Sequence, residues 1–190
     1  MSLEGPGPEA ESADPILLFF EGRGRDRTGR TFEDLLGFDH YELEVDHRYI
    51  QWLFPIPEQS TFSAYSPRLS DVAIHAFRAR PELRDQLTRA FSHILDFYGL
   101  QLSSGPPVRV VEASTFSHRA RSWVTGGNHN YIRISRILRS LQCLGLAAQA
   151  EAFLAFLDNL ALARPDAIDP RTLQYWRLRA AGDGKAPPAP

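Results

Sequence analysis

The sequence predicts an all-α protein, and three observations support this fold class. Two long stretches, residues 81–98 and 128–145, repeat apolar residues at the three-and-four spacing of a helix, and a glycine stops each of them. Proline and capping residues mark further helix starts. The chain shows no βαβ alternation, internal repeat or sustained heptad, so we expect one compact, bundle-like domain over residues 14–181. Residues 1–13 and 182–190, rich in small and polar residues, are expected to be disordered tails.

The first helices are predicted from the residues that begin them. Asp14-Pro15 is a capping residue followed by a first-turn proline, and Thr31 with Asp34 approximates a capping box. Residues 22–29 lie between these two starts and alternate arginine with glycine and a carboxylate. We therefore expect two short helices joined by a charged loop.

The next segment leads into the stretch around which the other helices are expected to assemble. Residues 38–45 carry Tyr41 and Val45 at i, i+4 spacing, with acidic residues between them. A dense aromatic run follows, between Asp46 and two prolines. We expect Asp46 to cap a short helix that ends before Pro55, because the proline ring clashes with the preceding turn and has no N–H to donate.

The middle of the chain holds the strongest helical pattern. Residues 58–67 are rich in serine and proline and predict a loop. Ser70 is placed to cap a helix that runs to Arg80, and Pro81 opens the long periodic helix that Gly99 stops.

The last third of the chain contains one candidate strand and four further helices. Residues 100–113 include a valine-rich segment that predicts a short extended arm, and residues 116–123 predict a weaker helix. Asn128 is placed to cap the next strong helix. An alanine- and leucine-rich helix follows over residues 147–163, and Asp169 with the proline after it begins the last one.

Composition narrows the class of protein. The chain has 190 residues, of which 43% are hydrophobic, enough for a full core. The formal net charge of -2 argues against a globally basic nucleic-acid binder. The lone Cys143 cannot form an internal disulfide. Because no apolar run is long enough to span a bilayer and no signal peptide is apparent, we expect a soluble, cytoplasmic protein.

Three blocks carry a family resemblance. They read DHRYIQWLFP at residues 46–55, LDFYGL at 95–100 and NHNYIRISRILRSL at 128–141. In this order they resemble the conserved region of the opioid growth factor receptor family, over a span from about Pro15 to Trp176. The resemblance implies an all-α module unlike the seven-helix opioid receptors.

The resemblance also implies a role. Members of this family are described as receptors for an enkephalin peptide that act at the nucleus to restrain growth. The present chain ends near the module and carries no long acidic or repetitive C-terminal extension of the animal kind. We therefore expect a short, stand-alone relative, microbial in origin as one option, with nuclear association only in a eukaryote.

Residue patterns for catalysis are not apparent. None of the histidines shows a metal-ligand spacing such as H-E-x-x-H: His40, His47, His75, His93, His118 and His129. No nucleophile elbow, phosphate loop or dinucleotide fingerprint is present. A hydrolase with His47 as its base would lack a nucleophile partner. We therefore expect no enzymatic activity, no metal and no cofactor.

The candidate site is a groove with aromatic walls, flanked by the only polar clusters beside aromatic helices. These clusters are Asp46-His47 and residues 128–130. Tyr49, Trp52 and Tyr131 would form the walls, and Arg133 and Arg136 would contact an anionic group. The predicted peptide- or partner-binding residues are His47, Arg48, Tyr49, Trp52, His129, Asn130, Tyr131, Arg133 and Arg136.

A structural interpretation stands beside the functional one. Asp46 and Asn128 are favoured as N-caps, each of which is typically worth about 1 kcal/mol to a helix. Arg133 and Arg136 form a basic stripe with Arg139 on one helix face. Such a stripe could hold a peptide carboxylate or a phosphate, or it could be a solvated outer face. The sequence does not separate these alternatives.

Two classes of function remain. The first is a binding module that takes a short peptide or a protein partner in the groove, which the resemblance favours and for which it implies an enkephalin-like peptide. The second is a nucleic-acid or nucleotide-associated protein that uses the arginine stripe, against which the net charge argues. Steep salt dependence of binding would indicate the second class, because phosphate contacts release counterions.

Overall fold

The computed structural model describes residues 13–58 and 66–182. Within these residues it contains ten α-helices and a two-stranded antiparallel sheet, so the predicted all-α class is confirmed with one short hairpin added. The predicted disordered tails lie almost entirely outside the described residues, and so does most of the loop predicted over residues 58–67. The chain groups into two compact units, residues 1–90 and 91–190, and the single domain stays a prediction.

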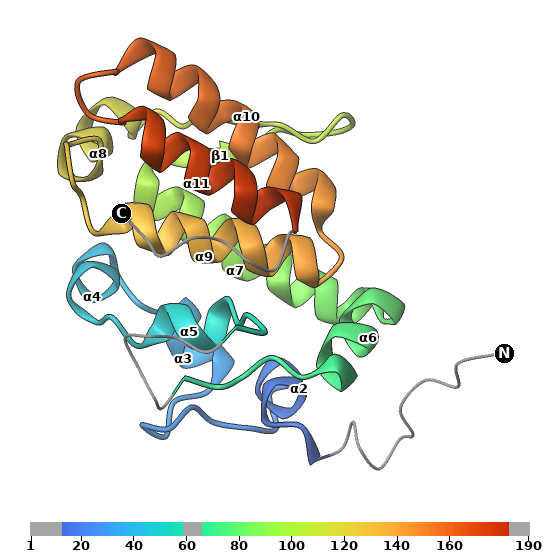
Figure 1. Ribbon diagram of the computed structural model, residues 1–190. Helices are drawn as coiled ribbons and strands as arrows, with labels where there is room; N and C mark the ends of the chain where they lie inside the picture. Colours follow the sequence, from blue (N-terminus) through green and yellow to red (C-terminus); the bar gives the residue numbers. More distant parts are fainter. Residues whose placement is uncertain (1–12, 59–65, 183–190) are drawn as a thin grey trace, which may run out of the picture. The chain divides into compact units, whose positions relative to one another are not determined.

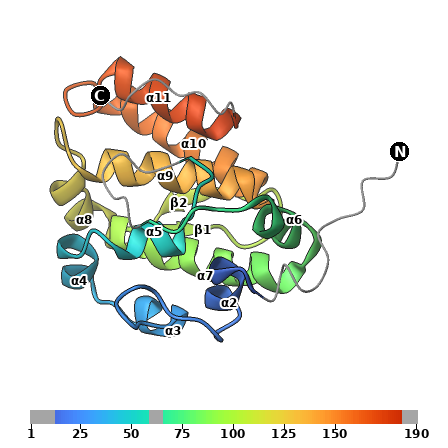
Figure 2. The ribbon, with the colours of Figure 1, turned by 60° about the horizontal axis from the view of Figure 1, so that its bottom comes forward.

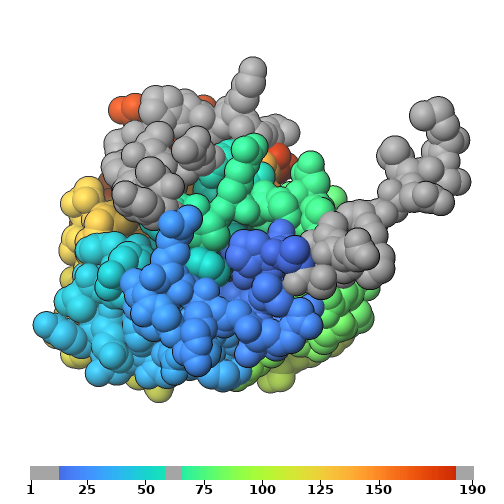
Figure 3. All heavy atoms as spheres, turned by 90° about the horizontal axis from the view of Figure 1, so that it is seen from below, coloured from blue at the N-terminus to red at the C-terminus, as the bar shows by residue number. Residues whose placement is uncertain are grey.

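The first unit contains short helices and the first half of a long one. Their bounds are α2 (Pro15–Phe20), α3 (Phe32–Leu36), α4 (His40–Val45), α5 (Tyr49–Leu53), α6 (Asp71–Ala79) and the first part of α7 (Pro81–Tyr98). Figure 3 views this unit from the side of α2, α3 and α4, in blue to cyan. Three predicted caps are confirmed: Asp14 accepts from two N–H groups of α2, Ser70 caps α6, and Thr31 forms a full capping box.

An aromatic cluster fills the core of the first unit. The Phe19 ring lies 5.1 Å from that of Trp52 and 5.7 Å from that of Phe32, measured between centroids. The Phe20 ring packs edge-on against Phe77 at 4.9 Å. Aromatic pairs of this kind add about 0.5–1.5 kcal/mol each beyond the area they bury. The aromatic run of α5 therefore contacts α2 through Trp52 and Phe19, and ring contacts join α2 in turn to α3 and α6.

The second unit is built on one central helix. Its elements are the rest of α7, β1 (Leu100–Leu102), β2 (Val110–Glu112), α8 (Phe116–Trp123), α9 (Asn130–Cys143), α10 (Ala147–Ala163) and α11 (Pro170–Ala181). Helix α9 packs against both α10 and α11, which also contact each other (Figures 1 and 2). No helix of the part of the chain that the structure describes combines the length and apolar character needed to cross a membrane.

The extended arm predicted over residues 100–113 is a β-hairpin. Leu100 pairs with Glu112 and Leu102 with Val110 in antiparallel register. The hairpin follows α7 directly because Gly99 adopts a left-handed conformation with φ of 76°, which stops the helix as predicted.

Candidate functional site

Four of the predicted site residues lie in the first unit, where two are exposed and two are buried. His47 and Arg48 are exposed, on the turn between α4 and α5. Tyr49 is fully buried and Trp52 is only 7% exposed. The two polar side chains thus stand on a turn directly before an aromatic helix that is anchored in the core.

Asp46 fixes this turn in a way that the sequence did not indicate. The prediction that Asp46 is the N-cap of the aromatic helix is wrong. Asp46 ends α4, and α5 begins only at Tyr49. Its carboxylate instead accepts the backbone N–H of Arg48 at 2.7 Å and is paired with the guanidinium groups of Arg48 and Arg30. Two cations and one amide hold the carboxylate on the turn, so it is not available to the first N–H groups of α5.

Arg30 connects this turn to a second, buried carboxylate. Asp26 accepts the backbone N–H groups of Thr28 and Arg30, at 2.8 and 2.9 Å, and the hydroxyl of Thr28. Its other oxygen accepts the Arg30 Nε–H at 2.7 Å. The loop over residues 22–29, predicted to be an ordinary charged loop, is therefore tied to Asp46 through Arg30. We call Asp26, Arg30 and Asp46 the clasp.

The clasp lowers the pKa values of both of its carboxyl groups. Burial alone would raise the pKa of Asp46, but the hydrogen bonds from Arg48 and Arg30 outweigh it and lower the pKa to about 2. The pKa of Asp26 is lowered in the same sense, because hydrogen bonds from Arg30 and Thr28 outweigh its burial. The ionised form of both groups is therefore favoured in the folded state.

Because the clasp depends on ionised carboxylates, we expect the free energy of unfolding to fall in acid. A carboxyl group whose folded pKa is lowered stabilises the fold above its unfolded pKa, and this contribution is lost as the pH falls through the folded value. For Asp46 the window runs from 3.8 down to about 2. Asp46→Asn should lower the free energy of unfolding by roughly 1–2 kcal/mol at pH 7. It should also flatten the acid limb, which is the fall of that free energy at low pH, as urea unfolding between pH 7 and pH 2 would measure.

Asp85→Asn, at an exposed position on α7, is the control and should change stability at pH 7 by less than about 0.5 kcal/mol. An unchanged acid limb in Asp46→Asn would contradict the role of the clasp.

The other five predicted site residues lie in the second unit, at the beginning and middle of α9. Asn130 is fully buried and forms the hub of a polar cluster. Its side-chain oxygen lies 3.2 Å from Arg133 Nη1 and 3.4 Å from the hydroxyl of Tyr98. The exposed His129 lies beside it, with 3.4 Å between His129 Nε2 and Asn130 Nδ2.

The start of α9 lies close to its predicted position. The helix begins at Asn130 with His129 at the N-cap position, which makes no side-chain cap bond. Asn128 still supplies the capping interaction one residue earlier, because its side-chain oxygen accepts the backbone N–H of Asn130 at 3.0 Å. Its amide donates to the carbonyl of Ser122 at 2.9 Å and so ties α9 to α8.

Tyr131 is buried and belongs to the packing between α9 and α11. Its hydroxyl donates to the carbonyl of Ala167 at 3.2 Å, and Trp176 Nε1 donates to the Tyr131 carbonyl at 3.0 Å. The Tyr131 and Trp176 rings meet edge-on at 5.3 Å. Burial raises the pKa of Tyr131 to about 12, so the hydroxyl remains protonated and able to donate.

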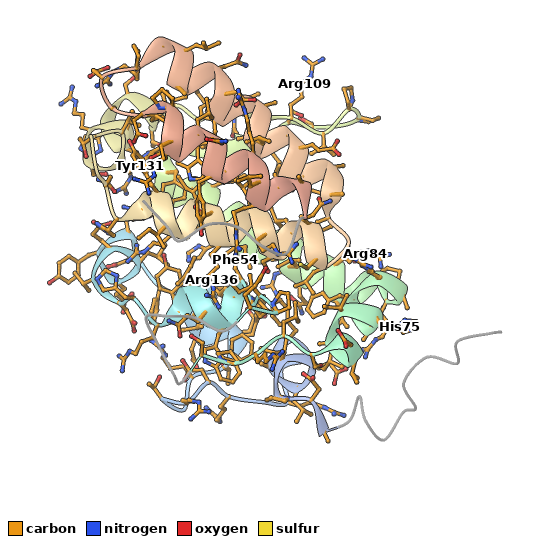
Figure 4. The ribbon with its side chains drawn as sticks, in the orientation of Figure 1. Phe54, His75, Arg84, Arg109, Tyr131 and Arg136 are labelled. Atoms are coloured by element: carbon orange, nitrogen blue, oxygen red, sulfur yellow. The ribbon has the colours of Figure 1, made fainter. Side chains whose placement is uncertain are left out.

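The arginine stripe on α9 is not a solvated outer face. Arg133 and Arg139 are only 5% and 8% exposed, whereas Arg136 is half-buried. Arg139 Nη1 donates to the carbonyl of Gly182 beyond the end of α11 at 2.6 Å. Figure 4 shows Tyr131 and Arg136 on α9. The spacing of the arginines left a ligand contact and a solvated face open as alternatives, and the packing of α9 against α10 and α11 excludes a fully solvated face.

The structure brings the predicted residues together in two groups, one in each unit. The first-unit group is His47, Arg48, Tyr49 and Trp52, and the second-unit group surrounds Asn130. That both groups line one groove stays a prediction. Within residues 13–58 and 66–182, no group of three or more His, Cys, Asp or Glu side chains is placed to hold a metal ion. Asp26 and Arg30 were missed, although their i, i+4 spacing beside glycines was a readable signal.

Comparison with known proteins connects these features to a family. The family model described as the opioid growth factor receptor (OGFr) conserved region matches residues 28–180. The opioid growth factor receptor of Mus musculus is 39% identical over 62% of this chain and 19% of its own length. The Homo sapiens receptor is 34% identical over 79% of this chain and 23% of its own length.

A second group of relatives carries a different name. The opioid growth factor receptor-like protein 1 of Rattus norvegicus is 35% identical over 65% of this chain and 26% of its own length. The chain thus spans only about a fifth to a quarter of the length of the curated relatives it matches. No solved structure matches the chain. Since the family model covers most of the sequence, this chain belongs to the opioid growth factor receptor family.

Proposed function

We propose that the chain is a non-enzymatic, helical module that binds a short peptide or a protein partner. The observation that carries this proposal is family membership over residues 28–180, in a family whose relatives are named as receptors. An enkephalin-like peptide is the first candidate ligand, because these relatives are named as receptors of an opioid growth factor. A cytoplasmic location, or a nuclear one in a eukaryotic cell, belongs to the same proposal.

Rigid support beneath exposed polar side chains favours a recognition role. His47 and Arg48 stand on a turn that Asp46 and Arg30 fix, and the exposed His129 stands beside the buried Asn130. Binding surfaces gain affinity when their contact groups are held in place before the partner arrives. In this proposal the exposed side chains and the half-buried Arg136 make the contacts.

The buried members of the predicted set have a supporting role in this proposal. Tyr49, Trp52 and Tyr131 hold the segments that present the polar groups, and Arg133 orients Asn130 through a 3.2 Å contact. The nucleic-acid alternative loses support from the same observation, because Arg133 and Arg139 are buried and would not reach a phosphate backbone without rearrangement.

The test is a calorimetric titration of the chain with an enkephalin pentapeptide and with a scrambled peptide of the same composition. The double variant Arg48→Gln/Arg136→Gln keeps the aliphatic stems but removes two charges, and it should bind at least tenfold more weakly. Arg68→Gln/Arg171→Gln removes one exposed charge from each unit elsewhere and should bind as the wild type does.

A parallel pull-down covers the case of a protein partner. The wild type and the two double variants are immobilised, and the captured proteins are compared by mass spectrometry. A partner that the control retains and Arg48→Gln/Arg136→Gln loses would support the proposal. Equal binding of both pentapeptides together with identical captures by all three proteins would overturn it.

A further inference from the structure

Charge is divided unequally between the two units. Residues 1–90 contain 16 carboxylates and 10 arginines, a formal charge of -6, whereas residues 91–190 contain 7 carboxylates and 11 basic residues, a formal charge of +4. The near-neutral total of -2 conceals this division. Residues 113–150 contain five arginines and neither Asp nor Glu. This acid-free stretch includes α8 and all of α9.

Helix α8 presents part of this positive charge to solvent. Its apolar side is buried, with Trp123 at 0% exposure and its Nε1 donating to the carbonyl of Tyr98 at 3.0 Å. Phe116 is likewise buried and meets Phe156 of α10 edge-on at 5.8 Å. The opposite side carries exposed cationic and hydroxyl-bearing residues: Ser117, His118, Arg121 and Ser122. We call these four residues, with the half-buried Arg119, the α8 face.

The cations of the α8 face are not neutralised within the described chain. Among residues 13–58 and 66–182, no carboxylate forms an ion pair with Arg119 or Arg121. The loop between α10 and α11 approaches Gly126, just after α8, and carries two carboxylates. Both are engaged: Asp166 pairs with Arg164 at 3.0 Å, and Asp169 caps α11. Within residues 13–58 and 66–182, the positive charge of the α8 face is therefore left without a carboxylate partner.

We propose that the α8 face is a docking surface for a short acidic segment of a partner protein. Guanidinium groups bind carboxylates through paired N–H donors, and the serine hydroxyls beside them add further donors. This surface is separate from the residues that carry the proposed function, so the two proposals stand independently. The sequence alone did not single out α8, because its arginines are not spaced as a motif.

An acidic protein segment fits this surface better than a nucleic acid does. Proteins that bind single strands combine a charged groove with exposed aromatic side chains on which bases stack. The large aromatic residues of α8, Phe116 and Trp123, are buried. Two arginines and one histidine are also few for duplex binding, in which about six to ten phosphate contacts are common.

The experiment uses a fluorescein-labelled, glutamate-rich peptide as the probe and anisotropy as the readout. The wild-type chain should bind the peptide, and binding should weaken as salt is raised, because exposed charges are screened. Amide chemical-shift changes on titration should be centred on residues 114–125. The double variant Arg119→Gln/Arg121→Gln should weaken binding about tenfold or more.

Arg109→Gln is the matched control. Arg109 is an exposed arginine of the same unit that lies on the hairpin, well away from α8 (Figure 4). This variant should bind the peptide as the wild type does. Equal losses in both variants, shift changes centred elsewhere, or tighter binding of a single-stranded oligonucleotide than of the peptide would each overturn the proposal. Melting curves of both variants should match that of the wild type, which separates lost contact from lost fold.

Discussion

Replacing Gly99 with alanine is expected to unfold the second unit at moderate temperature. Gly99 has φ of 76°, which costs an L-residue about 1–2 kcal/mol. An added Cβ would also lie 2.7 Å from the Cα of Phe116 and 2.9 Å from the Cβ of Arg119. Neither atom can move without shifting α8, so overpacking adds about 1–3 kcal/mol. The total of about 2–5 kcal/mol is a large part of the stability of a typical domain, and urea unfolding would measure it.

Gly127 provides the control that separates the two causes. It has φ of 69°, but an added Cβ would meet no atom within 4 Å. Gly127→Ala should therefore show only the backbone cost of about 1–2 kcal/mol. If both variants lose the same stability, the close approach of α8 to Gly99 is not a constraint on the fold. If Gly99→Ala loses more by the expected margin, α8 is fixed against the end of α7 at this glycine.

Local chemistry explains which parts of the fold could be predicted from the sequence. A capping box needs only a hydroxyl and a carboxylate three residues apart, so Thr31 and Asp34 were readable. A glycine after a long apolar repeat predicts a left-handed stop, and Gly99 has that conformation. These signals depend on the residue and its near neighbours, and tertiary contacts did not override them.

For residues 100–113 the sequence predicted an extended segment but not its pairing into a hairpin. The valines of residues 108–111 indicated an extended arm, but strand pairing depends on a partner at a distance along the chain. In α4, the i, i+4 pair Tyr41 and Val45 marks a face that is 73% and 52% exposed, whereas Leu43 between them is fully buried. A helix of six residues is too short for its hydrophobic periodicity to show which side faces the core.

For the candidate site, the sequence showed which kinds of residue lie close together but not which of them are buried. The spacing of Arg133, Arg136 and Arg139 shows that they share a face, and only the packing of α9 against α10 and α11 decides that two of them are buried. The clasp was hidden for the same reason. Asp46 binds Arg30, sixteen positions away, so its role is set by tertiary structure and not by the helix that follows it.

Replacing Trp52 with alanine is the second large effect, and it tests whether this residue supports the site or contacts a partner. Trp52 is 7% exposed, and the centroid of its ring lies 5.1 Å from that of Phe19, whose ring also lies 5.7 Å from that of Phe32. Removing the ring leaves a cavity in the aromatic cluster, for which the typical cost is about 3–5 kcal/mol. Urea unfolding should show this loss in the transition of the first unit.

Trp52→Phe supplies the control, because it keeps an aromatic ring beside Phe19 and should lose much less stability than alanine does. A loss of less than about 0.5 kcal/mol in Trp52→Ala would place the ring outside the core in solution and make it a contact for a partner. The binding of Trp52→Phe distinguishes support of the site from direct contact with a partner. If it is stable and still binds the enkephalin pentapeptide or the captured protein as the wild type does, Trp52 acts by holding α5 in place and not by contacting the ligand.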